Sequence, residues 1–357
     1  GGMRLWQARA TRRPPGCSPA AALAAVLAAV VVLAPAWLQL GAFDRQDDAA
    51  IAAQRRADHT EGADIDRLAT MAERDGGGRT YGGMPSNWGQ DFTVGAVPVF
   101  KYLESRDVDE VGYTLRTASL MTGPEYFFDD RDASDYQLFG IRYLILPAGW
   151  QPAVRARPTM RSGPYQLWTI DGGGYVRAGR IAGVISADRA SLGARSVQLL
   201  RSGLAADGAY LGVSYGAART VGLSTGTPST AGQDRLPPAP NQAAAQTGTV
   251  RAEDADLGDG EAAATVRMHR PGIVVLSASY DPGWTATVNG RPAPVRMVAP
   301  ALVAVDAPAG TDHVEFRFHG YGGYPELLAL SGLTLAVIAA APAARRRGSR
   351  KRRSPPA

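Results

Sequence analysis

Cysteine, histidine and lysine are scarce in this sequence. The single cysteine, Cys17, excludes a disulfide within the chain. The four histidines have no ligand-like spacing with cysteine or carboxylate residues, so no metal site is predicted. The triple glycines at 76–78 and 172–174 do not complete a dinucleotide-binding fingerprint, and the sequence has no phosphate-binding P-loop motif. The sequence therefore predicts neither a metal nor a cofactor.

Acidic residues are missing from both ends of the chain, and this hides the charge of the middle. The formal net charge is +5, from 38 Lys and Arg residues against 33 Asp and Glu residues. Residues 41–324 nevertheless hold 27 basic and 32 acidic residues. The chain is thus an acidic body between two basic tails, which argues against a nucleic-acid partner.

A long uncharged run lies near the C-terminus, between Leu327 and Ala344. Counted from Pro325, and so with Glu326 included, the stretch to Ala344 has 20 residues, and a helix of that length rises about 30 Å, the thickness of the hydrocarbon core of a bilayer. Tyr321 and Tyr324 precede it, and seven basic residues follow. These flanks predict a membrane span at 325–344 and a cytoplasmic basic tail at 345–357. A buried helix of a soluble protein is the alternative.

The N-terminus has the mirror-image pattern. Four arginines in residues 1–13 precede an uncharged run over 14–43, which predicts a cytoplasmic segment followed by a span that runs outward. A cleaved signal peptide is the alternative. Both spans place the central region outside the cytoplasm. The expected location is the cell membrane, crossed more than once, with both termini cytoplasmic.

The chain opens with Gly1-Gly2-Met3, which is not a natural start. We expect it to be the C-terminal piece of a larger polytopic membrane protein, with a tag scar as the alternative.

Residues 44–175 are expected to form a small extracytoplasmic α/β module. Asp44–Asp48 marks the exit into water, and glycines 76–78 end a helix predicted over 49–74. The further predicted elements are a strand at 79–82, a helix at 97–105, and strands at 111–116, 141–146 and 165–170.

Residues 176–320 have the pattern of an antiparallel β-sandwich, jelly-roll-like in type. Strands are predicted at 273–278, 284–288, 301–306 and 313–318, with a possible helix at 190–202. Asn289-Gly290 is a strong hairpin signal. Residues 221–249 have the composition of a linker-like loop. The predicted fold class is α+β with two transmembrane helices.

Several of these segments resemble known proteins. The segments are Pro271–Leu276, Tyr280–Trp284, Val288–Gly290, Pro308–Gly310 and Val314–Phe316 leading into a span, together with Tyr136–Ile145, Tyr165–Trp168 and Tyr175–Arg177. This series resembles the C-terminal portion of the YfhO-like bacterial membrane proteins. That family is similar to GT-C glycosyltransferases, which use polyprenyl-phosphate-linked sugars on the outer face of the membrane.

The resemblance implies a role in cell-envelope glycan assembly, with the lipid bilayer, a polyprenyl-phosphate-linked sugar and a glycan acceptor as partners. No catalytic residue of the family can be carried onto this sequence. Asp44, Asp47 and Asp48 open the first extracytoplasmic loop, but an exit loop is often acidic simply to stay in water. The sequence therefore predicts a region that binds or positions a saccharide or lipid-linked acceptor and is catalytically inert alone. The alternative is a non-catalytic, membrane-anchored β-sandwich that binds envelope glycan or a protein.

A polar, glycine-rich loop carries the main candidates for substrate binding, namely Tyr81, Asn87, Trp88 and Asp91. An aromatic ring beside an amide and a carboxylate is the mixture that stacks on sugars and bonds to them. An ordinary loop is the alternative. Trp284 is a further candidate for stacking, although packing between two sheets is favoured for it. The motif around Ser214, with Asp306 and His313 after it, matches a hydrolase triad in order and is interpreted as a chance match.

Overall fold

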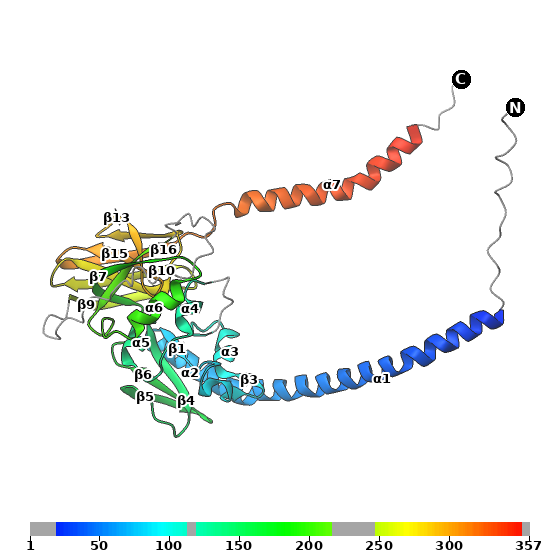
Figure 1. Cartoon of the computed structure of the whole chain (residues 1–357), viewed down its shortest axis with the longest axis horizontal. Helices are drawn as coiled ribbons and strands as arrows, with labels where there is room; N and C mark the ends of the chain where they lie inside the picture. The colour runs from blue at the N-terminus through cyan, green and yellow to red at the C-terminus, as the bar shows by residue number, and fades with distance from the viewer. Residues whose placement is uncertain (1–18, 113–118, 216–246, 352–357) are drawn as a thin grey trace, which may run out of the picture. The chain divides into compact units, whose positions relative to one another are not determined.

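The computed structural model describes residues 19–112, 119–215 and 247–351 (Figure 1). The chain divides into two compact units, residues 1–60 and 61–357. The predicted cytoplasmic segment 1–13 lies outside the described residues, as do most of the predicted linker 221–249 and the last residues of the tail 345–357.

The first unit is built on α1 (Pro19–Ala57), a helix of 39 residues. It is rich in Ala and Leu, the strongest helix formers, and it continues through Asp44–Asp48 without a break. Its large apolar side chains, such as Val31 and Trp37, are exposed. Among the described residues, one helix is long and apolar enough to cross a membrane, judged by length and composition, and this stretch lies near the N-terminus.

The second unit begins with α2 (Ala63–Arg74) and a four-stranded sheet of order β1-β4-β6-β5. Its strands are β1 (Arg79–Tyr81), β4 (Ile141–Pro147), β6 (Tyr165–Ile170) and β5 (Ala156–Ser162). β1 and β4 are parallel, and the other pairs are antiparallel. The predicted strands at 79–82, 141–146 and 165–170 are confirmed.

Short elements surround this sheet. They are η2 (Trp88–Gln90), the β2 (Thr93–Val94) and β3 (Val97–Pro98) hairpin, α3 (Val99–Glu104), α4 (Thr122–Glu125) and α5 (Ala133–Leu138). The helix predicted at 97–105 is present as α3, in shorter form. Of the strand predicted at 111–116, residues 113–116 lie outside the described residues. Val111 and Gly112 are not in a strand, while Glu110 forms an isolated bridge with Thr80.

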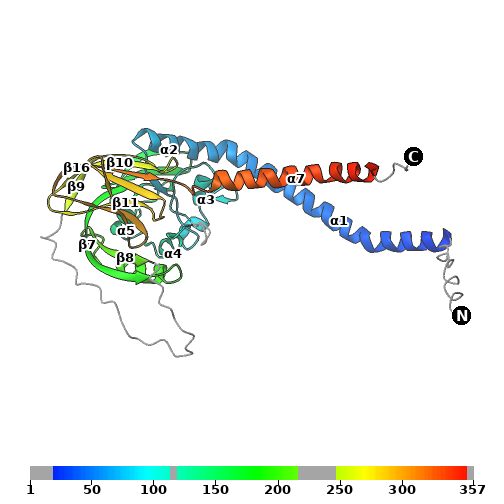
Figure 2. The same cartoon turned by 90° about the horizontal axis from the view of Figure 1, so that it is seen from above.

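The next layer is a closed barrel of order β11-β15-β14-β8-β7. Its strands are β7 (Val176–Ala187), β8 (Ala209–Tyr215), β11 (Gly272–Ser279), β14 (Val295–Val298) and β15 (Leu302–Ala307). β7 and β8 lie side by side and are parallel (Figure 2). The prediction of an antiparallel sandwich is therefore wrong for this pair, while the other strand pairs of the barrel are antiparallel. The reason is α6 (Leu192–Leu200), a helical crossover of the kind that returns the chain to the same edge in the same direction.

The last layer is an antiparallel sheet of order β13-β12-β16-β10-β9. Its strands are β9 (Gly248–Asp256), β10 (Glu261–Met268), β12 (Trp284–Val288), β13 (Arg291–Ala293) and β16 (Gly310–Phe318). Asn289 and Gly290 have φ of 53° and 72°, as the predicted two-residue hairpin requires.

One strand links the two main cores. Ile273 and Val275 of β11 pack into a core shared with the first sheet, which includes Ile141. Val274 and Leu276 pack into a core between the barrel and the last sheet. Because successive residues of a strand point to opposite faces, burial of both faces explains the unbroken apolar sequence of β11. The first sheet and the barrel thus share one core.

The second unit ends in α7 (Tyr324–Lys351). The described apolar stretch, Tyr324–Ala340, is exposed and is shorter than a full span. The second transmembrane helix therefore stays a prediction.

Candidate ligand-binding site

Three of the predicted binding residues lie together at the end of β1 and in the loop that follows it. Asn87 Oδ1 accepts hydrogen bonds from the backbone N–H groups of Met84 (2.8 Å) and Gly89 (3.0 Å). Asn87 Nδ2 donates to the hydroxyl of the buried Tyr81 at 2.6 Å. The amide of Asn87 therefore holds the loop in shape, as a residue that caps a short helix does.

Trp88 joins this group through an acceptor that the sequence did not indicate. Its Nε1 donates to Asp130 Oδ2 at 2.7 Å. Its ring lies 5.9 Å from the ring of Trp150, which is 50 % exposed. Asp91, by contrast, is exposed and ends η2. The structure thus places the exposed Trp150 beside the half-buried Trp88.

Trp284 lies apart from this loop, in the core between the barrel and the last sheet. Its Nε1 donates to the backbone carbonyl of Ser279 at 3.1 Å, and its ring lies 5.3 Å from that of Phe318. Only 9 % of the residue is exposed. This position agrees with the favoured packing role.

The three residues whose order matches a hydrolase triad are not paired with one another in the contacts that follow. Ser214 lies within β8, Asp306 pairs with Arg296, and His313 lies 3.2 Å from Glu315. Within the described ranges, no group of three or more His, Cys, Asp or Glu residues is placed to hold a metal ion.

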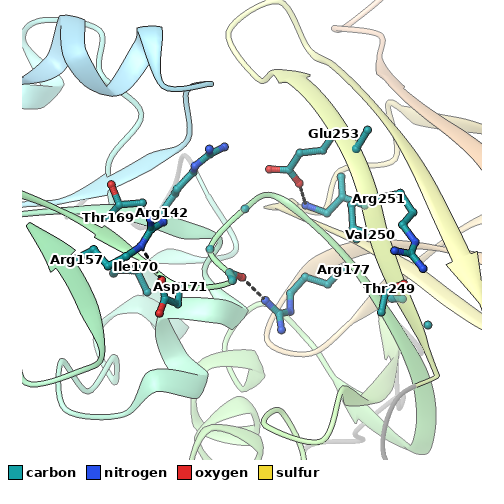
Figure 3. Close-up of a pocket in the computed structure, with 17 residues that line it drawn as sticks. Arg142, Arg157, Thr169, Ile170, Asp171, Arg177, Thr249, Val250, Arg251 and Glu253 are labelled. Carbon is teal, nitrogen blue, oxygen red and sulfur yellow. Dashed lines mark hydrogen bonds and ion pairs between the residues drawn. The ribbon is translucent and has the colours of Figure 1, made fainter. Parts of the chain in front are cut away.

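A cleft with four arginines is the most distinctive polar site of the second unit (Figure 3). Arg142 of β4 and Arg157 of β5 come from the first sheet, Arg177 from β7, and Arg251 from β9. The cleft has a volume of about 530 Å³. We call it the arginine cleft.

The glycine turn between β6 and β7 forms part of its wall. Gly172 and Gly174 have φ of +74° and +158°. A Cβ on Gly173 would lie 2.5 Å from the carbonyl oxygen of Ile141, and one on Gly174 would lie 2.5 Å from Glu253 Oε1. This close approach requires glycine, and it brings Glu253 of β9 close to the turn after β6.

Most of the charged groups in the arginine cleft are fixed by specific contacts. Arg177 donates to the carbonyl oxygen of Gly172 at 3.3 Å and to Gln137 Oε1 at 2.9 Å. Arg142 donates to the carbonyl oxygen of Asp75 at 2.8 Å. These hydrogen bonds of the two guanidinium groups end on neutral oxygens, and Arg142 also lies over the ring of Tyr143.

The two acidic residues of the cleft are also engaged. Asp171 forms ion pairs with Arg157 at 3.0 Å and with Arg155 at 3.4 Å. Glu253 accepts from the backbone N–H groups of Tyr175 and Val176. Arg251 is exposed and has no hydrogen-bond or ion-pair partner among the described residues. Four arginines against two carboxylates leave an excess of positive charge.

This arrangement is suited to an anion. Arginine presents a planar fork of donors that matches phosphate and carboxylate groups. The sequence did not reveal the cleft because its four arginines are spread over 109 residues, from Arg142 to Arg251, and lie on strands of three different sheets. The local signal was the triple glycine at 172–174, which is followed directly by the segment Tyr175–Arg177.

A second polar hollow, of about 660 Å³, contains buried acids. Oε2 of Glu110 and Oε2 of Glu125 are buried and have no hydrogen-bond partner within the described part of the chain. Burial, with neighbouring acids, raises the pKa of Glu110 to about 9. Burial also raises the pKa of Glu125 to about 7, although Arg79 opposes the rise. Both groups can hold a proton near neutral pH.

Asp109 and Tyr175 line this hollow, and Arg79 contacts both of them. Arg79 donates to the carbonyl oxygens of Phe139 (2.6 Å) and Ser277 (3.0 Å), and it pairs with Asp109 at 3.3 Å. The hydroxyl of Tyr175 donates to Asp109 at 2.6 Å. Burial alone would lower the pKa of Arg79, but the charge of Asp109 and its neighbours outweighs burial and raises it. Arg79 therefore joins the first sheet to the barrel as a permanent cation.

Comparison with known proteins gives one family. The model of the family described as "Bacterial membrane protein YfhO" matches residues 234–329, so the YfhO-like character of this part is confirmed. No curated protein and no solved structure gives a significant match. Together, the family match and the apolar helix α1 support a membrane protein that associates with the lipid bilayer.

Proposed function

We propose that the second unit binds and positions a saccharide that carries an anionic group, during assembly of cell-envelope glycan on the outer face of the membrane. The arginine cleft carries this proposal. Its side chains bind rather than break bonds, and the anion is the phosphate of a sugar or of a lipid-linked acceptor, or a sugar carboxylate.

The topology forms part of the same proposal. The spans at 14–43 and 325–344 would hold residues 44–320 outside the cytoplasm, with both termini inside. The resemblance to glycosyltransferases that use lipid-linked sugars supports a phosphate-bearing ligand in this compartment. The acidic character of residues 41–324 would keep anions away from most of the surface, so a basic cleft would concentrate them locally.

Calorimetric titration of the whole chain in detergent micelles tests the proposal. The probes are glucose 1-phosphate, inorganic phosphate and glucose. We expect heat of binding with the two phosphates, tighter binding of the sugar phosphate, and weakening as salt is raised. Equal binding of glucose and glucose 1-phosphate would contradict an anion site.

The second candidate function is a non-catalytic module, anchored in the membrane, that binds neutral envelope glycan. The exposed Trp150 beside Trp88 favours it, because two adjacent rings offer a stacking surface for sugars. Substitution Trp150→Ala would abolish binding of a neutral oligosaccharide while glucose 1-phosphate still binds. Loss of both together would place both ligands at one site and contradict a separate glycan surface.

A further inference from the structure

Two adjoining hollows of the second unit share no lining residue with the arginine cleft. One has a volume of about 390 Å³ and the other of about 520 Å³. Leu120 and Arg189 line both hollows, so the two form one continuous depression.

Aromatic side chains are exposed along this depression. Tyr126 and Phe127 line the first hollow and are 55 % and 37 % exposed. Tyr215 and Phe318 line the second and are 41 % and 38 % exposed. These four residues, which we call the aromatic face, come from three separate segments of the chain. A folded protein usually buries such large rings, so a group of them on one surface indicates a contact with something apolar.

The chain itself indicates what lies against this face. Phe318 ends β16, and α7 begins six residues later at Tyr324. Tyr321 and Tyr324 are 66 % and 62 % exposed, and their rings meet at 5.6 Å. Six residues span at most about 20 Å, so the aromatic face lies close to the point where the chain would enter the bilayer.

The charges of the depression are balanced. Arg79 and Asp109 pair with each other, and Arg189 and Asp281 add one charge of each sign. The depression therefore has no net charge to attract anionic headgroups. Its aromatic rings favour contact with the interfacial region of a lipid bilayer, where such rings are stable.

We propose that the aromatic face rests on the outer surface of the lipid bilayer and holds the second unit against the membrane. The inference rests on the proposed function in one respect, which is the membrane span formed by α7. The aromatic face binds the lipid interface and no other protein. This contact gives the second unit a fixed orientation beside the span.

Depth-dependent fluorescence quenching tests this. The full chain with Cys17→Ser is placed in phosphatidylcholine nanodiscs that contain lipid with a nitroxide just below the headgroup. Single cysteines from Phe127→Cys or Tyr215→Cys carry an environment-sensitive label. Tyr321→Cys reports the start of the span. Ala309→Cys is the matched control, because Ala309 is exposed and directly precedes Gly310. Gly310 begins β16 and Phe318 ends it, so the two lie about 27 Å apart along the strand.

We expect labels at 127, 215 and 321 to lose fluorescence to a similar extent, and the label at 309 to keep it. The pattern should be the same when phosphatidylglycerol replaces part of the lipid. Quenching at 321 with none at 127 and 215 would overturn the docked face and leave the span intact. Absence of quenching at 321 would overturn the span, and the docked face with it. Arg189→Cys, also exposed, replaces either face variant that fails to fold.

Discussion

Glu253 Oε2 accepts a hydrogen bond from the backbone N–H of Val176 at 3.0 Å, and Oε1 of the same carboxylate accepts one from Tyr175 at 3.2 Å. These bonds join β9 to the start of β7, across a separation of 77 residues. They also bind the carboxylate to backbone donors, so it does not pair with the arginines around it. Glu253 therefore shapes the arginine cleft without filling it.

Substitution Glu253→Ala should lower the free energy of unfolding by about 1–3 kcal/mol, because two backbone donors lose a charged acceptor. Chemical unfolding in detergent micelles measures this. The control is Glu261→Ala, since Glu261 pairs with Arg317 on an exposed surface, where such a pair contributes about 0–1 kcal/mol. Equal losses in both variants would show that the contact of Glu253 has no special weight.

The glycine turn gives a second prediction. Substitution Gly174→Ala should destabilise the chain by about 1–3 kcal/mol, because φ is +158° and the new Cβ would meet Glu253. Gly203→Ala is the control, since it has open space around it. Thermal melting compares the two. A Gly174 variant as stable as the Gly203 variant would contradict the requirement for glycine.

The strands could be predicted from sequence more easily than the way in which they combine. Alternating apolar residues and the Asn289-Gly290 turn predicted β12, β16 and the hairpin of the last sheet, and these are confirmed, whereas β9 and β10 were not predicted. The parallel pairing of β7 with β8 could not be seen, because it depends on where the α6 crossover returns the chain. Local patterns describe turns and strands, whereas closure of a barrel depends on contacts far apart in sequence.

The candidate site shows the same limit. The loop after β1 was found because Tyr81, Asn87 and Trp88 are close in sequence. Asp130 and Trp150, which complete its contacts, lie at least 42 residues further on from Trp88. The arginine cleft draws on four separate strands, so no window of sequence contains it.

Buried carboxyl groups predict a pH dependence of stability. The pKa of Glu110 is raised from 4.5 to about 9, so the folded state keeps a proton that the unfolded state releases above pH 4.5. Stability should therefore fall as pH rises from about 4.5 toward 9, with Glu125 adding to the fall up to about pH 7. Burial of the charged form is the cause.

Substitution Glu110→Gln should raise the free energy of unfolding at pH 8 by about 1–3 kcal/mol and flatten its decline above pH 7. Denaturant unfolding at pH 5, 7 and 8 measures the slope. Glu261→Gln, in which an exposed carboxylate outside this hollow is changed, should leave it unaltered. A slope that survives in the Glu110 variant would place the titrating group elsewhere.

The proposed topology is also testable. A reporter that folds only outside the cytoplasm should be active when fused after Gly248 and silent when fused after Arg353, because the basic tail is expected inside. Activity at both points would contradict the second span, because both fusion sites would then lie outside the cytoplasm. The reverse pattern would invert the orientation of both spans.

The most direct test of the anion site compares two charge reversals in the full chain. Arg251→Glu changes the exposed arginine in the arginine cleft, and Arg291→Glu makes the same change in net charge at the exposed β12–β13 hairpin. Titration with glucose 1-phosphate should show affinity reduced by at least about tenfold, or about 1.4 kcal/mol, for Arg251→Glu and unchanged for Arg291→Glu. Equal affinities in the unmodified chain and the Arg251 variant would contradict binding in the arginine cleft.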